Sequence, residues 1–297
     1  MIATTGFFDG VHLGHRLVIE RLVSLAQQRG DESLVVTFWP HPRAVLQDGA
    51  RELRLLTTLE EKKELLRSLG VGRVEVLDFS RPFAALTAEQ YLRDVLRDRF
   101  GVTTLLVGYD NRLGSDRLTA ASLAPMASAL GIELIELPPL SFRAEPQAES
   151  RNLEISSTKI RKFLEEGNIT SATEMLGYGY SLKGVVVAGN RLGRTIGFPT
   201  ANMKLYEPLK LVPGRGVYVV EVEVLGKTYR GMTNIGLRPT VGGTSTTIET
   251  HILDFDEDIY GLPLRITFLR RLRDEIHFPS LDALKAQLTL DRTACRE

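Results

Sequence analysis

Short apolar runs alternate with longer helical segments through roughly the first 176 residues. The runs are rich in β-branched and leucine side chains and lie at 33–38, 74–79, 104–108 and 132–137. Thr58 with Glu61, and Thr87 with Gln90, have the spacing of capping boxes, which mark helix starts. Strands that alternate with helices in this way predict an α/β domain built on a parallel sheet.

The pattern changes after residue 179. Within 217–224, Val220, Val222 and Val224 alternate with Glu221 and Glu223, which predicts a strand buried on one face only. A turn at Leu225-Gly226 follows, and further strands are predicted at 182–188, 228–233, 246–253 and 263–269. With a last helix at 280–290, these strands predict a small antiparallel β-barrel. We therefore expect two domains, 1–178 and 179–297, and a polar surface loop at 143–152 inside the first.

Composition narrows the possible partners. Lys plus Arg and Asp plus Glu number 37 each, so no overall field favours nucleic acid or an acidic membrane. The single cysteine, Cys295, excludes an internal disulfide framework and fits a reducing compartment. The sequence has no leader pattern and no apolar run near the roughly 20 residues of a membrane span. We expect a cytoplasmic protein that binds small molecules rather than nucleic acid or membranes, as a monomer or weak homo-oligomer.

A first candidate site is the run GFFDGVHLGH at 6–15, which connects a predicted strand to a predicted helix. Glycines and free N–H groups at a helix start favour a bound phosphate. His12 and His15, one turn apart, could both donate hydrogen bonds to phosphate oxygens as charge builds up in a transition state. The run therefore indicates phosphate transfer. The residues alone also allow ordinary turn histidines, or a zinc pair completed by His41 and Asp9.

A second candidate site is the segment 189–202, which contains three glycines, two arginines and a proline-fixed turn. Such a loop can wrap phosphates with its backbone N–H groups, although a basic surface hairpin would have a similar composition. It is not a Walker loop, because no Lys-Ser or Lys-Thr follows the last glycine. Glu249, on a predicted strand, would ordinarily be solvent-exposed.

The order of several motifs adds a resemblance. HLGH at 12–15 resembles the HxGH signature of nucleotidyltransferases, and TFWPHP (37–42), GYDNRLG (108–114) and ISSTKIR (155–161) follow. GFPTAN (197–202) looks like the motif of riboflavin kinases and precedes NIGLRPT (234–240) and ETHILD (249–254). Together, over about residues 3–292, these motifs resemble the bacterial bifunctional riboflavin kinase and FMN adenylyltransferase (FAD synthetase) family. Trp39 and Leu113 depart from its pattern, where an acidic residue and Phe are usual.

The resemblance implies a Rossmann-like nucleotidyltransferase domain followed by a riboflavin kinase barrel with a C-terminal helix. It implies ATP-dependent phosphorylation of riboflavin to FMN, then adenylylation of FMN to FAD with release of pyrophosphate. Mg²⁺ is the implied cofactor, and ATP, ADP, riboflavin, FMN, FAD and pyrophosphate are the small-molecule partners. A single-function FMN adenylyltransferase is disfavoured because Thr200, Asn202 and Glu249 are all present. An RNA-binding or flavin-binding regulator is disfavoured because no basic, aromatic-rich stripe occurs.

The resemblance also implies roles for particular residues. His12 and His15 bind ATP phosphates during catalysis, Glu249 is the general base for the ribityl hydroxyl, and Thr200 and Asn202 hold Mg²⁺. The other implied ATP-binding residues are Gly6, Phe8, Asp9, Gly14, Asp110, Arg112, Ser157, Thr158, Arg161, Gly189, Arg191, Gly193, Arg194, Gly197 and Pro199. The implied flavin-binding residues are His41, Pro42, Asn111, Arg238, Thr240 and Arg273.

Overall fold

A computed structural model describes residues 1–46, 53–108, 111–138, 155–189, 192–240 and 243–296. Contacts divide the chain into two compact units, Met1–Ser157 and Thr158–Glu297. The two domains predicted from the sequence, 1–178 and 179–297, remain a prediction. The predicted loop at 143–152 lies outside the described residues.

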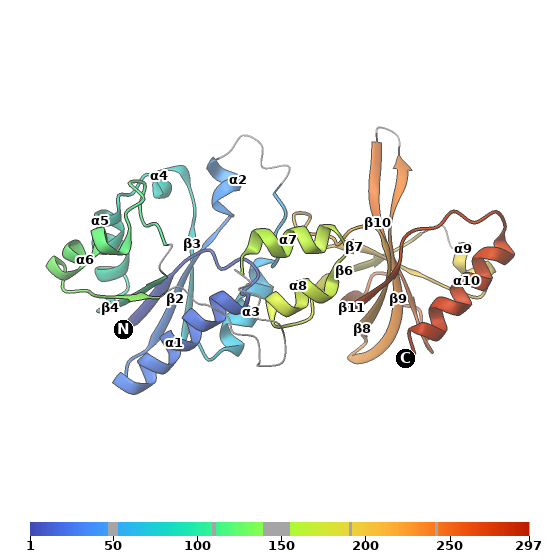
Figure 1. The fold of residues 1–297 in the computed structure, drawn as a ribbon, viewed down its shortest axis with the longest axis horizontal. Coiled ribbons are helices and arrows are strands. Elements are labelled where there is room, and N and C mark those ends of the chain that lie inside the picture. Colours follow the sequence, from blue (N-terminus) through green and yellow to red (C-terminus); the bar gives the residue numbers. More distant parts are fainter. Residues whose placement is uncertain (47–52, 109–110, 139–154, 190–191, 241–242, 297) are drawn as a thin grey trace. The chain divides into compact units, whose positions relative to one another are not determined.

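The first unit is an α/β domain (Figure 1). Its elements are β1 (Ile2–Thr5), α1 (Leu13–Arg29), β2 (Ser33–Trp39), α2 (Pro42–Leu46), α3 (Leu59–Ser68), β3 (Arg73–Asp78), α4 (Arg81–Ala84), α5 (Ala88–Gln90), the π-helix η2 (Tyr91–Arg97), β4 (Thr104–Gly108), α6 (Ala120–Ala129) and β5 (Glu133–Leu137). The capping boxes at Thr58 and Thr87 are both present, which confirms the predicted helix starts.

The five strands form one parallel sheet in the order β3-β2-β1-β4-β5, as the sequence predicts. Alternate strand residues pack on opposite faces: Ala3 and Leu105 lie in the core with η2 and α6, and Ile2 and Leu106 lie in the core with α1. Burial of both faces explains why the strands read as continuous apolar runs. The order reverses between β1 and β4, so the motifs that follow these strands lie where parallel sheets bind ligands.

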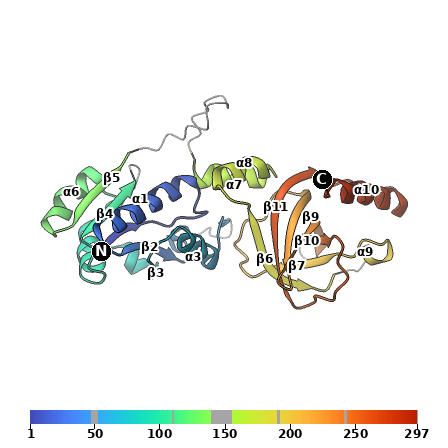
Figure 2. The ribbon, with the colours of Figure 1, turned by 90° about the horizontal axis from the view of Figure 1, so that it is seen from below.

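The second unit contains two helices and a barrel. Its elements are α7 (Ser157–Glu165), which begins one residue before the unit, α8 (Ile169–Leu176), β6 (Ser181–Val187), α9 (Leu192–Thr195), β7 (Ala201–Leu205), β8 (Gly216–Val224), β9 (Lys227–Thr240), β10 (Gly243–Ile252), β11 (Pro263–Arg273) and α10 (Leu281–Ala294). The strands are antiparallel and close in the order β10-β7-β6-β11-β8-β9, which confirms the predicted barrel. Figure 2 shows the strands curving around one another, with α10 outside them.

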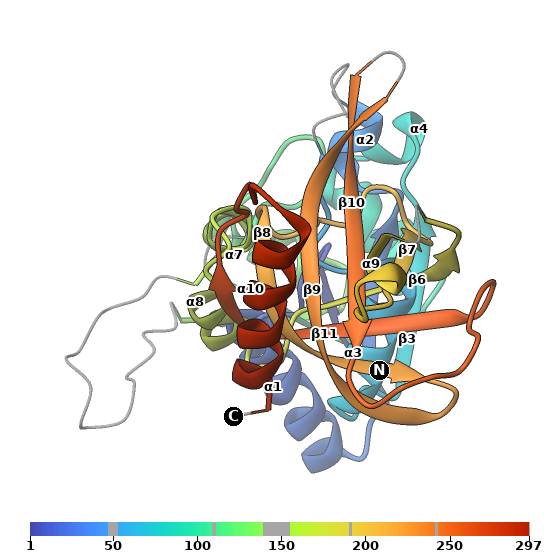
Figure 3. The ribbon, with the colours of Figure 1, turned by 90° about the vertical axis from the view of Figure 1, so that its right-hand side faces the viewer.

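Strand β8 is more buried than its sequence predicts. The predicted alternation holds near its end, where Val222 is buried and Glu223 is exposed. Its first half is buried on both faces because α10 packs over it, bringing Leu288 and Cys295 against Val217 and Val219 (Figure 3). The C-terminal helix therefore forms a second core on the outside of the barrel.

Two turns explain local sequence choices in this unit. Leu225 and Gly226 have φ of 52° and 71°, as a two-residue type I′ hairpin between β8 and β9 requires. Gly167, between α7 and α8, has φ of 74°, and a Cβ there would lie 2.6 Å from the Tyr218 hydroxyl. Only glycine lets the α7–α8 hairpin approach the barrel this closely.

Candidate active sites

The loop between β1 and α1 has an unusual backbone held by a buried carboxylate. Phe8 and Val11 have φ of 51° and 37°, which is uncommon for residues with side chains. The buried Asp9 carboxylate accepts hydrogen bonds from the Leu56 N–H (3.0 Å), the Thr57 N–H (3.1 Å) and the Thr57 hydroxyl (3.3 Å). These bonds fix the loop against residues almost 50 positions away, so the Asp9 side chain is committed to shaping it.

His12 and His15 lie together at the start of α1. His12 is the N-cap, and its Nδ1 accepts a hydrogen bond from the His15 N–H at 3.3 Å. Its Nε2 therefore carries the proton of the neutral ring and remains the donor. The two rings stack, with centroids 3.6 Å apart and 16° between planes. A Cβ on Gly14 would lie 3.3 Å from the His12 ring, so glycine leaves room for the stack.

His15 is held neutral by its surroundings. Its Nδ1 is buried and has no hydrogen-bond partner among the described residues. Burial lowers the pKa of His15 well below the usual value, and the neighbouring His12 and Lys62 lower it further. A neutral imidazole at this position can donate one N–H to an anion and gain a proton as negative charge develops.

The zinc interpretation of these histidines is not supported. His41 packs edge-on against Phe7, with ring centroids 4.1 Å apart, and its Nδ1 accepts a bond from the Arg43 N–H at 3.0 Å. The Asp9 carboxylate is occupied by backbone donors, as described. In the described part of the chain, no group of three or more His, Cys, Asp or Glu side chains is placed to hold a metal ion. Pro42 begins helix α2.

The structure describes residues 111–114 of the motif that follows β4. Asn111 is half-buried and donates its N–H to the Gly108 carbonyl at 3.0 Å, while Arg112 is exposed. Leu113 is buried in the core between the sheet, η2 and α6. Asp110 lies outside the described residues. Core packing therefore limits the size of the side chain at position 113.

Ser157, at the start of α7, contacts the first loop within the first unit. The Ser157 hydroxyl donates to the Asp9 backbone carbonyl at 2.9 Å. Thr158 is exposed and Arg161 is half-buried on the following turn, and both belong to the second unit.

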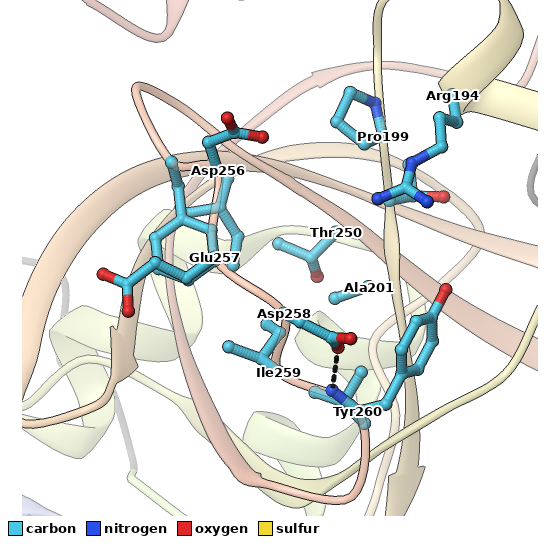
Figure 4. Close-up of a pocket in the computed structure, with 13 residues that line it drawn as sticks. Arg194, Pro199, Ala201, Thr250, Asp256, Glu257, Asp258, Ile259 and Tyr260 are labelled. Carbon is cyan, nitrogen blue, oxygen red and sulfur yellow. Dashed lines mark hydrogen bonds between the residues drawn. The ribbon is translucent and has the colours of Figure 1, made fainter.

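Two pockets of the barrel share Thr200. The first, the Arg194 pocket, has a volume of about 390 Å³. It is lined by Arg194, Pro199, Thr200, Ala201, Thr250 and residues 255–260, among others. Figure 4 shows Arg194 and Pro199 on one side of this pocket and the Asp256 and Glu257 carboxylates on the other. The second, the Glu249 pocket, has a volume of about 300 Å³ and is mostly apolar, with lining residues that include Phe198, Thr200, Val217, Met232, Glu249, Phe278, Leu284 and Leu288.

Strand pairing brings Glu249 to the predicted metal ligands. Glu249 on β10 pairs with Asn202 on β7, in the strand that follows Thr200 directly. Burial raises the pKa of the half-buried Glu249 carboxyl, and the positive charge of Arg238 partly offsets this. A carboxylate with a raised pKa at the edge of an apolar pocket is a candidate proton acceptor.

His251, two residues further along β10, holds the adjacent turn. Its Nδ1 lies 2.8 Å from the Pro199 carbonyl oxygen, which can only accept, so Nδ1 carries the proton. Its ring also packs against Phe198, with centroids 5.2 Å apart. Burial lowers the pKa of His251, which fits a neutral ring with a positioning role.

Close packing explains the glycines of this loop. A Cβ on Gly189 would lie 2.2 Å from the Asn202 amide nitrogen, and one on Gly193 would lie 2.2 Å from the Phe198 carbonyl oxygen. Gly197 has φ of 83°, a conformation that favours glycine. Arg191 lies outside the described residues.

The predicted flavin residues of the barrel differ in their surroundings. Arg273 lines the Glu249 pocket, but its guanidinium bonds the buried Asp291 carboxylate of α10 at 2.6 to 3.1 Å. Arg238 is exposed on β9. The side chain of Thr240 lies outside the described residues.

Comparison with known proteins decides the family. Residues 1–159 match the family model for FAD synthetase, and residues 176–297 match that for riboflavin kinase. A bifunctional riboflavin kinase/FMN adenylyltransferase of Escherichia coli (strain K12) is 38% identical over 297 residues, covering 100% of this chain and 92% of the relative. The chain belongs to the bifunctional riboflavin kinase/FMN adenylyltransferase family. The Bacillus subtilis (strain 168) protein of the same name is 33% identical, covering 98% of this chain and 90% of the relative.

A solved structure shares the whole fold of the enzyme. It is titled a macrolide-efflux protein from Streptococcus pneumoniae, and it matches with a TM-score of 0.89 and 33% identity. The match covers 100% of this chain and 93% of that one. Within the described ranges of the enzyme, no helix is long and apolar enough to cross a membrane.

The enzyme phosphorylates riboflavin to FMN with ATP and then adenylylates FMN to FAD with release of pyrophosphate, which confirms the function predicted from the motifs. Its substrates and products are ATP, ADP, riboflavin, FMN, FAD and pyrophosphate. Because both family models match, the single-function adenylyltransferase alternative is set aside.

Sequence reasoning missed two features of the first site. One is the set of backbone bonds to Asp9, which no local pattern reveals. The other is Lys62, which is 1% exposed on α3. Leu59, Lys62 and Leu66 have helical spacing, and a lysine inside such an apolar stripe is a signal that could have been recognised.

Proposed function

We propose that the β1–α1 loop performs adenylyl transfer and that the two barrel pockets perform phosphorylation. The observation that carries the second assignment is the position of Thr200, which lines both pockets, with Glu249 paired to Asn202 beside it. In this assignment the Arg194 pocket takes ATP and the apolar Glu249 pocket takes the flat isoalloxazine ring of the flavin.

In the kinase reaction, Glu249 accepts the proton of the ribityl 5′-hydroxyl while that oxygen attacks the γ-phosphorus of ATP. The bond from the γ-phosphorus to the bridging oxygen breaks, and ADP leaves. The raised pKa of Glu249 supports this role, because it makes the carboxylate a better base. Gly189, Arg191, Gly193, Arg194, Gly197 and Pro199 form the loop around the ATP phosphates.

Mg²⁺ is the proposed cofactor of the barrel site. Thr200 and Asn202 offer hard oxygen ligands, which magnesium prefers. Because Gly189 has no Cβ, the space beside the Asn202 amide is left open. When bound, the ion would neutralise charge on the ATP phosphates. The protein's own part is to hold these two side chains next to Glu249, and His251 contributes by fixing the Pro199 carbonyl before Thr200.

In the adenylyl transfer, the FMN phosphate attacks the α-phosphorus of ATP and pyrophosphate leaves. His12 and His15 donate N–H groups to the ATP phosphates, and the loop residues Gly6, Phe8 and Gly14 let the phosphates approach the backbone. Asp9 shapes this loop. Ser157, Thr158 and Arg161 receive the departing pyrophosphate, and Asp110 and Arg112 line the nucleotide pocket.

The flavin contacts are divided between the units in the same way. His41, Pro42 and Asn111 contact FMN in the first unit. Arg238 and Thr240 contact riboflavin in the barrel. Arg273 lines the Glu249 pocket and connects it to α10 through its bond to Asp291.

We place the enzyme in the cytoplasm, as a monomer or weak homo-oligomer without nucleic-acid or membrane partners. The balanced charge and the buried free thiol of Cys295 support this. Cell fractionation with immunoblotting tests the location, and light scattering after size exclusion tests the oligomeric state.

A time course tests the proposed division. The purified enzyme is incubated with riboflavin and ATP, with Mg²⁺ or with excess EDTA, and the flavins are separated by chromatography. We expect FMN first and FAD later with Mg²⁺, and no FMN with EDTA. FMN formation at full rate in EDTA would contradict the metal assignment of Thr200 and Asn202.

A further inference from the structure

Lys62 joins the loop after β1 to the end of strand β2. Its Nζ donates to the Phe7 carbonyl oxygen at 2.9 Å and to the Thr37 hydroxyl at 3.1 Å. The Thr37 hydroxyl in turn donates to the same Phe7 oxygen at 3.1 Å. Phe7 follows β1 and Thr37 lies near the end of β2, so one ammonium group joins the 6–15 run to the 37–42 run.

The surroundings of Lys62 are costly for a charge. The side chain is 1% exposed, and no carboxylate forms a salt bridge with it within the described ranges. A cation–π contact, with Nζ 3.8 Å from the centroid of the Phe7 ring, offsets part of this cost. Burial lowers the pKa of Lys62 to about 8, and the nearby Asp9 carboxylate only partly offsets this. An unpaired buried cation reduces stability, so its presence needs another reason.

The proposed adenylyl transfer gives a reason for a buried charge at this position. Lys62 is charged at neutral pH, and this charge reaches His15, whose pKa it helps to lower. The ammonium group also contacts the loop directly, through the Phe7 carbonyl oxygen and the Phe7 ring. A fixed positive charge in a dry site stabilises an anion more than a solvated charge does.

We propose that Lys62 is a positioning residue for adenylyl transfer, which holds the Phe7 carbonyl against Thr37 and keeps a positive charge behind the loop that receives the ATP phosphates. This inference rests on the assignment of adenylyl transfer to that loop. Lys62 acts through Phe7 and the histidine pair, without touching the reacting atoms.

If Lys62 had only a structural role, a different result would be expected for the variant Lys62→Met. In Lys62→Met the Phe7 oxygen still accepts from Thr37, and methionine fills the space of the lysine stem. Removal of the buried charge should therefore leave thermal stability unchanged or higher. If Lys62 only held the fold together, the same variant would unfold at a lower temperature and lose activity for that reason.

The test compares Lys62→Met with Lys63→Met. Lys63 is the matched control, because it lies next in the helix and pairs with Glu60 at 3.1 Å on the outer side. For each variant we would measure the melting temperature, the kcat/KM for ATP in FMN adenylylation, and riboflavin phosphorylation in the same preparation. We expect Lys62→Met to lower the adenylylation kcat/KM by roughly 10- to 100-fold, with phosphorylation and melting temperature retained. Adenylylation equal to that of Lys63→Met, or a loss accompanied by a lower melting temperature, would overturn the inference.

A pH profile of the wild-type enzyme keeps the inference testable if the variant does not fold. The titratable groups that face Lys62 are the Asp9 carboxylate and the His15 imidazole, with His12 stacked on the latter. The pKa of His15 is lowered well below its usual value, whereas that of Lys62 is about 8, so we assign a loss of charge near pH 8 to Lys62. We expect adenylylation kcat/KM to fall as pH rises through about 8, with no matching fall in phosphorylation. A flat adenylylation profile would refute the inference, whereas no FAD at any pH would contradict the proposed function itself.

Discussion

The two candidate sites differ in whether they offer a free carboxylate. In the barrel, Glu249 faces an apolar pocket beside Thr200 and Asn202. In the β1–α1 loop, the only carboxylate, that of Asp9, is bound by backbone donors, and the remaining groups are neutral or positive. The attacking groups explain the difference. A ribityl hydroxyl must lose a proton to attack, whereas the phosphate of FMN is already ionised, so adenylyl transfer needs charge neutralisation but no base.

The strongest test of this contrast is Glu249→Gln. We expect loss of roughly 100- to 10,000-fold in the rate of riboflavin phosphorylation, because the amide cannot accept the hydroxyl proton. Conversion of supplied FMN to FAD should continue at the wild-type rate. Glu223→Gln is the matched control, since Glu223 is exposed on β8 and pairs with Arg265. Equal loss of both activities would remove Glu249 from the role of base.

The converse test is His15→Ala. We expect FAD formation from FMN to fall by roughly 100-fold or more, because a preorganised donor to the ATP phosphates is lost, while phosphorylation is retained. Gln28→Ala, an exposed change on the same helix, serves as the control. Unchanged FAD synthesis in His15→Ala would show that the loop histidines do not bind the phosphates.

A smaller effect separates orientation from chemistry in the barrel. In His251→Asn the amide nitrogen lies near the position of Nδ1 and can still donate to the Pro199 carbonyl, whereas in His251→Gln it lies nearer the position of Nε2. We expect the Gln variant to lose about tenfold in phosphorylation kcat/KM, and the Asn variant much less, from the loss of one hydrogen bond. FAD formation from FMN is the internal reference. Equal losses in both variants would argue against the Pro199 bond as the reason for His251.

Sequence patterns were sufficient for elements whose signal is local. The parallel strands, the barrel strands, the Leu225-Gly226 turn and both capping boxes follow from residues close to one another in the chain. Strand β7 was not predicted, although apolar and polar residues alternate over Ala201–Leu205, because the strand overlaps the end of a loop motif.

Features that depend on distant partners could not be predicted in this way. The burial of Val217 and Val219 depends on α10, more than 60 residues later. The Asp9 bonds depend on the backbone at 56–57, and the ammonium of Lys62 depends on Phe7 and Thr37. In the first site, therefore, the motif indicated the phosphate-binding loop but not the groups that hold it in shape.

The closure of the barrel also bears on how the enzyme avoids aggregation. A closed barrel presents no unpaired strand edge to other chains, so the exposed edges of the described sheets belong to β3 and β5 of the parallel sheet. Both edges are charged: β3 carries Arg73 and Glu75, and β5 carries Glu133 and Glu136. Charged edge strands disfavour the edge-to-edge pairing that nucleates aggregates. The charges on β3 and β5 therefore protect the open sheet, whereas the closed barrel has no edge to protect.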